Sequence, residues 1–359
     1  MSNYKIETKC IQSGYTPKKG EPRVLPIYQS TTFKYDTSDQ MGRLFDLEDT
    51  GYFYTRLQNP TNDAVAAKIC DLEGGVGAML TSSGQAANFY AMFNICEAGG
   101  HIVASSAIYG GTYNLLGTTM KKLGIDCTFV SPEADEAELQ AAIRPNTKLI
   151  FGETISNPTL EVLDIELFAR VAHKNGIPLV VDNTFATPIN CRPFEFGADI
   201  VVHSTTKYMD GHATQVGGCI VDSGNFDWMA HKDKFPGLTT KDESYHGIIY
   251  AEKFGKMAYI TKCTTQLMRD LGSIPSPNNC FLLNLGLETL HLRMPRHCAN
   301  ALAVAKYLKN NEKVEWVNYP DLEGDKYHDR QLKYLPNGSC GVVTFGLKGG
   351  RDVAIKFMD

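Results

Sequence analysis

Seven short apolar runs recur between residues 60 and 255, and longer amphipathic stretches lie between several of them. The runs are VGAML (76–80), HIVASS (101–106), DCTFVS (126–131), KLIFGET (148–154), PLVVDNT (178–184), DIVVHSTT (199–206) and GGCIVD (217–222). Several are apolar throughout, which is typical of strands covered on both faces. Residues 135–143 and 165–176 have helical spacing. The alternation predicts an α/β fold, with a mostly parallel seven-stranded sheet and helices on both faces. It leaves the direction of the closing strand open.

The chain divides into three predicted regions. Residues 1–60 are rich in Gly, Pro, Tyr and Thr with little periodicity, and we expect them to form an N-terminal arm that packs on a neighbouring subunit. Residues 61–255 form the sheet domain. Residues 256–359 form a smaller α+β C-terminal domain, with an amphipathic segment at 281–309 and a strand at 340–348. The chain stops at Asp359 inside a helix expected to open at Arg351, which indicates a truncated sequence.

Composition argues against several classes of protein. The net charge of −5 argues against a nucleic-acid surface, which would show a basic face. The chain has no run of about 20 apolar residues that could cross a membrane. Its N-terminus lacks the apolar core of a signal peptide, so we expect a cytoplasmic protein. The ten cysteines form no C-x-x-C pair and are interpreted as reduced thiols, so no metal site is expected.

Polar side chains follow the ends of the predicted strands, where ligands bind in doubly wound sheets. Ser83, Gly84 and Gln85 open a helix after the first run, and such a turn binds phosphate or serves as an ordinary helix cap. Tyr109 lies on a glycine-flanked loop, where it could stack on a planar ligand or simply be an exposed tyrosine. Asn157 precedes Pro158 and is equally compatible with a turn.

Two charged residues also stand at strand ends. Asp182 closes the run PLVV, where a carboxylate either needs a cationic partner or caps a turn. Lys207 follows DIVVHSTT and is expected to be semi-buried because it stands at the end of a strand predicted to be buried. A desolvated lysine has a lowered pKa and is a better nucleophile. The alternative is a lysine whose amine reaches out to water. Taken together, the cradle, the aromatic ring, the carboxylate and the amine match the groups that bind pyridoxal phosphate.

Motifs along the chain support this hypothesis. They are YTRLQNPT (54–61), TSSGQAA (81–87), ETISNPT (153–159), VVDNTF (180–185), HSTTKYMDGH (203–212) and GLETLHLRM (286–294). In this order they resemble the Cys/Met-metabolism family of pyridoxal-phosphate enzymes. The resemblance implies a fold type I protein with an aspartate-aminotransferase-like large domain. It also implies a homotetramer built as a dimer of dimers.

The resemblance assigns roles by position. Lys207 would form the Schiff base, Asp182 would pair with the pyridinium nitrogen, and Tyr109 would stack on the ring and assist the leaving group. The phosphate would be held by Ser83, Gly84, Gln85, Ser204 and Thr206, and Asn157 would contact the ring or its phenolic oxygen. Tyr54 and Arg56 would reach the phosphate site of a neighbouring subunit. The family's arginine for the substrate carboxylate would lie beyond Asp359.

Within the family, the segment SYHGIIYAEKFG (244–255) and the SSGQAA motif resemble the O-acetylhomoserine sulfhydrylases. The expected reaction is γ-replacement on O-acetyl-L-homoserine with sulfide or a thiol, which gives homocysteine or methionine plus acetate. Alternatives are a methionine γ-lyase, an O-succinylhomoserine sulfhydrylase and a cystathionine γ-synthase. A catalytically silent relative is disfavoured by the intact Lys207, Asp182, Tyr109 and Arg56. A nicotinamide-dependent dehydrogenase is disfavoured because no G-x-G-x-x-G follows a strand.

Overall fold

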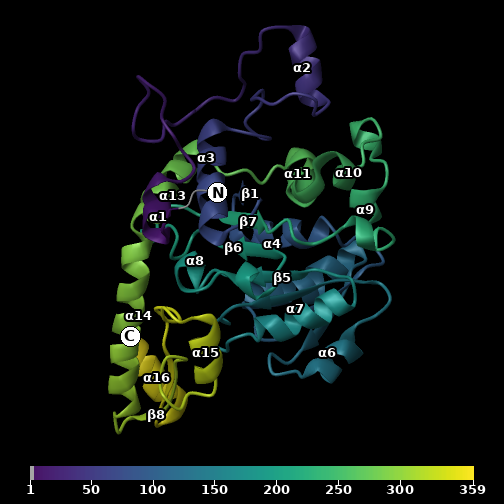
Figure 1. Cartoon of the computed structure of the whole chain (residues 1–359). Coiled ribbons are helices and arrows are strands. Elements are labelled where there is room, and N and C mark those ends of the chain that lie inside the picture. The colour runs from purple at the N-terminus through teal and green to yellow at the C-terminus, as the bar shows by residue number, and fades with distance from the viewer. Residues whose placement is uncertain (1–3) are drawn as a thin grey trace.

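A seven-stranded sheet forms the centre of the protein (Figure 1), which is described by a computed structural model over residues 4–359. The strands lie in the order β1-β7-β6-β5-β4-β2-β3. Their bounds are β1 Gly77–Thr81, β2 His101–Ser105, β3 Asp126–Val130, β4 Thr147–Glu153, β5 Leu179–Asp182, β6 Ile200–His203 and β7 Gly218–Asp222. Each strand overlaps one of the seven apolar runs, so the predicted sheet is confirmed.

The strand directions decide where polar loops gather. Strands β6, β5, β4, β2 and β3 pair in parallel, whereas β7 is antiparallel to both β1 and β6. This settles the direction of the closing strand. Because β7 runs against both of its neighbours, β1 is parallel to β6. The carboxyl ends of β1 and of the five parallel strands therefore lie at one edge.

Helices cover both faces of this sheet because successive strand residues point to opposite sides. In β6, Val201 packs in a core with α3 (Pro60–Glu73), whereas Val202 packs in a second core with α4 (Gly84–Phe93). The remaining helices of the sheet domain are α5 Gly110–Asn114, α6 Glu136–Ala142, α7 Ile165–Lys174, α8 Thr187–Asn190, α9 Pro236–Thr239 and α10 Tyr250–Phe254. Helices α11 (Ala258–Lys262) and α12 (Arg269–Leu271) follow.

The N-terminal region contains two short helices, α1 (Ile6–Gln12) and α2 (Ser38–Phe45), although its sequence shows little periodicity. Helix α1 packs on α3 and α13 (Pro277–Glu288). Helix α2 lies far from the sheet at the top of Figure 1, and Thr37 caps it by accepting a hydrogen bond from the Gln40 N–H at 3.1 Å. Local capping explains a helix that hydrophobic spacing does not reveal.

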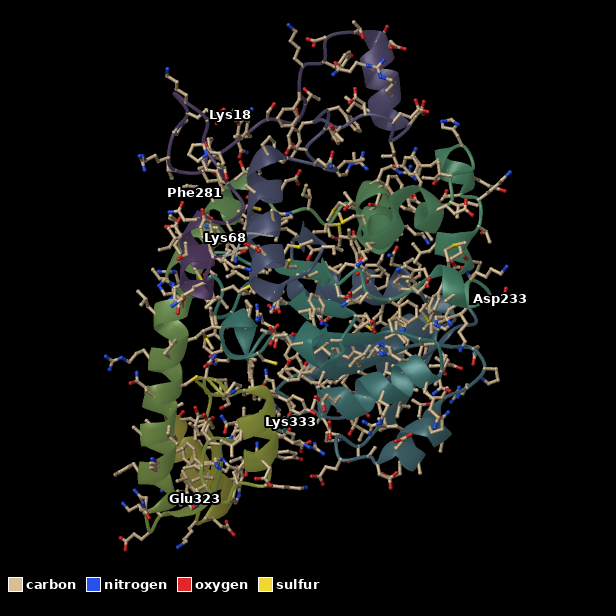
Figure 2. All side chains as sticks on the ribbon, viewed as in Figure 1. Lys18, Lys68, Asp233, Phe281, Glu323 and Lys333 are labelled. Carbon is tan, nitrogen blue, oxygen red and sulfur yellow. The ribbon has the colours of Figure 1, made fainter. Side chains whose placement is uncertain are left out.

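In the C-terminal region, the sequence indicates one amphipathic segment at 281–309, but the structure has two helices there. Helix α13 ends at Glu288, and α14 (Leu290–Lys309) begins after Thr289. An antiparallel pair, β8 (Val314–Asn318) and β9 (Thr344–Leu347), follows with α15 (His328–Tyr334) and α16 (Gly350–Met358). Lys333 on α15 lies beside the sheet domain (Figure 2), where its amine bonds Glu166 on α7 at 2.6 Å.

Candidate functional site

Most of the predicted site residues lie at the edge formed by the carboxyl ends of β1, β4, β5 and β6. Asp182 ends β5, and its Cα is paired with Val202 of β6 on one side and Glu153 of β4 on the other. Lys207 lies in the turn that follows β6. Parallel pairing therefore sets the carboxylate and the turn carrying the amine on neighbouring strands.

The predicted phosphate cradle is the contact between the start of α4 and the turn after β6. Ser83 caps α4 by accepting a hydrogen bond from the Ala86 N–H at 3.1 Å. Gly84 lies against Ser204, so closely that a β-carbon on Gly84 would stand 2.6 Å from Ser204 Cβ. The first N–H groups of a helix have no acceptor within the helix, and its dipole is positive there. The cradle therefore suits an anion.

Thr206 lies two residues after Ser204 in the turn that follows β6. Its hydroxyl donates to the Gly217 carbonyl at 3.2 Å and accepts from the Gly217 N–H at 3.0 Å. These two bonds tie the turn after β6 to the residue that precedes β7. The hydroxyl of the predicted phosphate ligand therefore lies in a fixed position.

Asp182 is held by three hydrogen bonds. Its Oδ1 accepts from the Thr184 N–H at 3.0 Å and from the Thr184 hydroxyl at 2.5 Å, and its Oδ2 accepts from Asn88 Nδ2 at 3.5 Å. Burial raises the pKa of Asp182, and these donors oppose that rise. The Thr184 hydroxyl also accepts from the Ser204 N–H at 2.8 Å, so it joins Asp182 to the turn that carries Lys207.

A chain of amides connects Asp182 to the loop of Tyr109. Asn88 Nδ2 donates to Gln85 Oε1 at 3.3 Å and to the Thr112 hydroxyl at 3.2 Å, and Thr112 donates to Gln85 at 3.1 Å. The Tyr109 ring is half exposed and lies beside Gly111. A side chain on Gly111 would overlap the ring and Gln85. The structure therefore brings the predicted tyrosine, cradle and carboxylate into one connected group.

The prediction that Lys207 is semi-buried is wrong, because its side chain is exposed. The apolar covering of β6 ends at His203, and the following turn lies on the open edge of the sheet. The turn itself is firmly held. The Gly211 N–H donates to the Lys207 carbonyl at 2.9 Å, and the Arg293 guanidinium donates to the Tyr208 carbonyl at 2.6 Å. The backbone of Lys207 is therefore held by hydrogen bonds to this turn, while its side chain is exposed.

Four further polar residues beside the site were not selected from the sequence, namely His203, Glu73, Asn183 and Glu153. Behind Asp182, the buried His203 side chain lies 2.6 Å from Glu73, which also accepts from Asn183 Nδ2 at 2.9 Å. At the end of β4, Glu153 accepts hydrogen bonds from the backbone of Tyr109 and Asn157. Their place in the sequence could have identified three of them. Glu153 and His203 end β4 and β6, Asn183 directly follows β5, and all three stand within the motifs quoted above.

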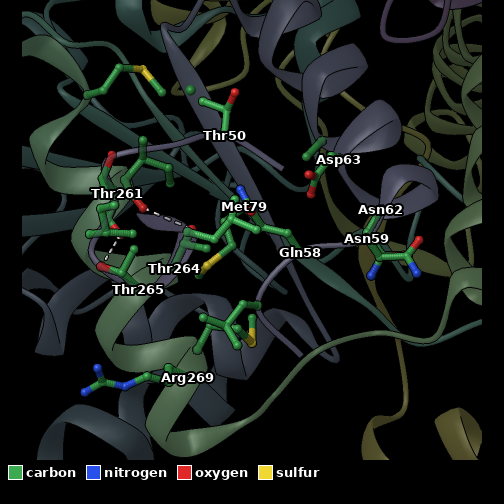
Figure 3. Close-up of a pocket in the computed structure, with 18 of the residues that line it drawn as sticks. Thr50, Gln58, Asn59, Asn62, Asp63, Met79, Thr261, Thr264, Thr265 and Arg269 are labelled. Atoms are coloured by element: carbon green, nitrogen blue, oxygen red, sulfur yellow. Dashed lines mark hydrogen bonds between the residues drawn. The ribbon is translucent and has the colours of Figure 1, made fainter. Parts of the chain in front are cut away.

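Tyr54 and Arg56 lie away from the edge. The Arg56 guanidinium stacks over the Tyr54 ring at 5.2 Å and donates to the Arg269 carbonyl. Both residues line a cavity of about 1130 Å³ between the N-terminal region and the body of the protein. Figure 3 shows it between the segment of Thr50 and Gln58 and the helical segment that reaches Arg269. The lining of this cavity includes none of the cradle residues, so within one chain the structure does not bring Tyr54 and Arg56 to them.

The residues present at the edge fit pyridoxal phosphate. Gly84 lets the start of α4 approach Ser204 closely, so the first N–H groups of that helix and the turn after β6 lie side by side. Asp182 supplies a fixed carboxylate, and Lys207 supplies an accessible amine on the same edge. A phosphate, a ring nitrogen and an aldehyde need these three kinds of partner.

Three other features of residues 4–359 bear on the predictions from the sequence. The ten cysteines are free, and nine of them are buried. Over this range no group of three or more His, Cys, Asp or Glu side chains could hold a metal ion. None of its helices combines the length and apolarity that spanning a bilayer requires.

Comparison with known proteins places these observations in a family. Residues 7–359 match the family described as Cys/Met metabolism PLP-dependent enzyme. The chain is 46% identical over 356 residues to the homocysteine synthase of Schizosaccharomyces pombe, which covers 99% of this chain and 83% of that protein. It is 45% identical over 367 residues to the O-acetyl-L-homoserine sulfhydrylase of Leptospira meyeri, and the matched region covers 99% of this chain and 82% of that protein.

A solved structure is also similar over most of its length. It is a Campylobacter jejuni chain assigned as an O-acetylhomoserine (thiol)-lyase, which contains a pyridoxyl-lysine-phosphate residue. The two folds agree with a TM-score of 0.93 at 35% identity, over 96% of this chain and 86% of that one. The α/β fold and the use of pyridoxal phosphate follow from these similarities.

Proposed function

The chain belongs to the Cys/Met metabolism family of pyridoxal-phosphate-dependent enzymes, and we propose that it catalyses γ-replacement on O-acetyl-L-homoserine. Sulfide as the incoming nucleophile gives homocysteine and acetate, and a thiol such as methanethiol gives methionine. The observation that carries this proposal is the 45–46% identity to a homocysteine synthase and an O-acetyl-L-homoserine sulfhydrylase over 99% of the chain.

The edge residues can perform the proton transfers of this reaction. When bound, pyridoxal phosphate withdraws electrons from the Cα of the amino acid, so that protons leave Cα and then Cβ more easily. Lys207 Nζ is accessible and accepts the Cα proton. Thr184 and Asn88 orient the Asp182 carboxylate by their hydrogen bonds, and this carboxylate would keep the ring nitrogen of the bound cofactor protonated. The Tyr109 hydroxyl assists the departure of acetate from Cγ.

Assembly into a homo-oligomer, with Tyr54 and Arg56 serving the phosphate site of a neighbouring subunit, is part of the proposal. Support comes from the N-terminal region, which exposes large apolar side chains, among them Val24, Ile27 and Phe45. Burying such surface against another subunit is favourable.

The direct test is a product assay with the purified, cofactor-loaded protein. With O-acetyl-L-homoserine and sulfide we expect equal amounts of homocysteine and acetate. If 2-oxobutyrate and ammonia were the main products instead, the reaction would be γ-elimination and the proposed γ-replacement would be wrong. Parallel assays with O-succinyl-L-homoserine identify the leaving group, and parallel assays with methanethiol identify the preferred nucleophile.

Replacing Lys207 tests the role of the amine. Lys207→Ala should abolish the absorbance band of the covalently bound cofactor near the visible edge and lower turnover by at least about a thousandfold. Lys121→Ala, at another exposed lysine, is the matched control and should keep both. A Lys207→Ala protein that kept both the band and turnover would exclude this assignment.

A further inference from the structure

Glu153 is a buried carboxylate at the centre of the proposed site. It is the last residue of β4, its Cα is paired with that of Asp182, and it is only 6% exposed. Burial raises the pKa of the Glu153 carboxyl well above its ordinary value, and the nearby Asp182 adds to that rise. A carboxylate in such surroundings costs stability, so a purely structural role would be served better by an uncharged side chain.

Each oxygen of Glu153 binds a different loop. Oε1 accepts from the Tyr109 N–H at 2.7 Å, and Oε2 accepts from the Asn157 N–H at 3.3 Å. Tyr109 lies in the loop after β2, whereas Asn157 lies in the loop after β4. One planar group therefore spans two loops that carry proposed site residues, beside the strand that carries Asp182.

This arrangement matters most for Tyr109. The residue stands at the N-terminus of a helix of five residues, and its ring is half exposed. A ring with so little packing around it takes its position mainly from its backbone. The short bond to Glu153 Oε1 restrains that backbone at the residue itself.

We propose that Glu153 is a positioning residue for the γ-replacement reaction, holding the backbone of Tyr109 and Asn157 at fixed distances from Asp182. The proposal rests on the proposed function, since it assigns Tyr109 to the leaving group. It predicts that residue 153 must supply two acceptor oxygens at the reach of a glutamate side chain, and that a negative charge alone is not sufficient. A displacement of about 1 Å in a reacting group can cost about a hundredfold in rate.

Two variants each remove one of these requirements, the second acceptor oxygen or the reach of the side chain. Glu153→Gln keeps the size but turns an amide N–H toward one of the two backbone donors, so that bond is lost. Glu153→Asp keeps the charge but withdraws the carboxylate by one methylene from both loops. Both variants should lower kcat by about 10- to 100-fold while KM stays within about threefold, because Tyr109 acts after substrate has bound.

Hydrogen exchange of the backbone provides a readout independent of activity. In the cofactor-loaded and cofactor-free protein, peptides spanning 106–113 and 154–160 should exchange at least about tenfold faster in both variants. Asp199→Asn is the matched control, because Asp199 is a buried carboxylate that accepts from the Leu179 N–H at 2.8 Å at the opposite end of β5. That control should speed exchange near Leu179 only and keep kcat within about threefold.

The outcomes are distinct. Faster exchange at both loops together with the loss of kcat supports the proposal. Unchanged exchange at Tyr109 and Asn157, or a Glu153→Asp protein with the parent kcat, overturns it. A parent protein that forms no homocysteine would refute the proposed function instead, and the exchange rates would still report whether Glu153 holds the two loops.

Discussion

Gly84 is the residue where the two halves of the phosphate cradle meet. A β-carbon at this position would stand 2.6 Å from Ser204 Cβ and 2.8 Å from Ser204 Cα. Because the backbone of Ser204 is fixed by its bond to Thr184, the start of α4 would have to move. Gly84→Ala should therefore destabilise the protein by about 1–3 kcal/mol in urea unfolding. It should also weaken pyridoxal phosphate binding, measured by spectral titration, by about tenfold or more.

Gly110 offers the matched control for this substitution. Like Gly84, it is the first residue of a helix at the same edge, yet no atom lies within 4 Å of the position its β-carbon would take. Gly110→Ala should keep the stability within about 0.5 kcal/mol of the parent. Equal losses in the two alanine variants would show that overlap with Ser204 is not the cause.

Single residues also mark the limit of what the sequence predicts. Asp182 and Lys207 could be selected because each charge ends an apolar run. Glu153 ends such a run too, but residue order does not reveal that its oxygens accept backbone N–H groups from two loops. The burial of Lys207 was wrongly predicted because it was extrapolated from the buried strand β6. The conformation of the turn that follows is set by its own hydrogen bonds, and its Lys207 side chain is exposed.

At the scale of elements, His101 links three strands at the amino end of β2. Its ring nitrogens lie 2.8 Å from the Thr147 hydroxyl of β4 and 2.9 Å from the Thr128 hydroxyl of β3. Burial lowers the pKa of His101 from 6.5 to about 4, and Arg144 contributes in the same direction. The ring is therefore neutral in the folded sheet over a range of pH in which it takes up a proton in the unfolded chain.

This difference predicts a pH dependence of stability. Because the folded pKa is below the unfolded one, the contribution of His101 is complete above pH 6.5 and is lost as the pH falls toward about 4. The loss should be on the order of 2 kcal/mol. Urea unfolding at several pH values should show a shallower decline in His101→Gln than in the parent. Parallel curves for the two proteins would rule out His101 as the source.

Elements differed in how well the sequence predicted them, for physical reasons. Central strands such as β2 and β6 were found because both of their faces are buried and their apolar runs are nearly continuous. Helix α2 was missed because it has little core to face and depends on its Thr37 cap. The break between α13 and α14 at Thr289 was missed because the apolar pattern continues across it.

At the scale of the whole molecule, the arrangement of the N-terminal region could not be predicted. The cavity of about 1130 Å³ joins residues near Thr50 to residues near Arg269, which are more than 200 positions apart in sequence. Such contacts depend on the packing of complete segments and leave no local pattern. Tyr54 and Arg56 border this cavity and not the cradle of their own chain. In the proposed assembly, they would instead contact the phosphate site of a neighbouring subunit.

Hybrid oligomers test that assignment. If Arg56 serves the site of a neighbour, Arg56→Ala and Lys207→Ala proteins are each inactive, yet a hybrid dimer of the two has one site with both residues intact. Random pairing of the two chains should then restore about a quarter of the parent activity per site. Co-expression with two affinity tags isolates the hybrid dimers, which should show about half of the parent activity per site because one of their two sites is intact, and light scattering gives their size. Pairing Lys207→Ala with Asp182→Asn is the control, because both changes lie in the site of one chain and no hybrid site is complete. Hybrids of Arg56→Ala and Lys207→Ala that stay as inactive as this control would place Arg56 in the site of its own chain or outside the site altogether.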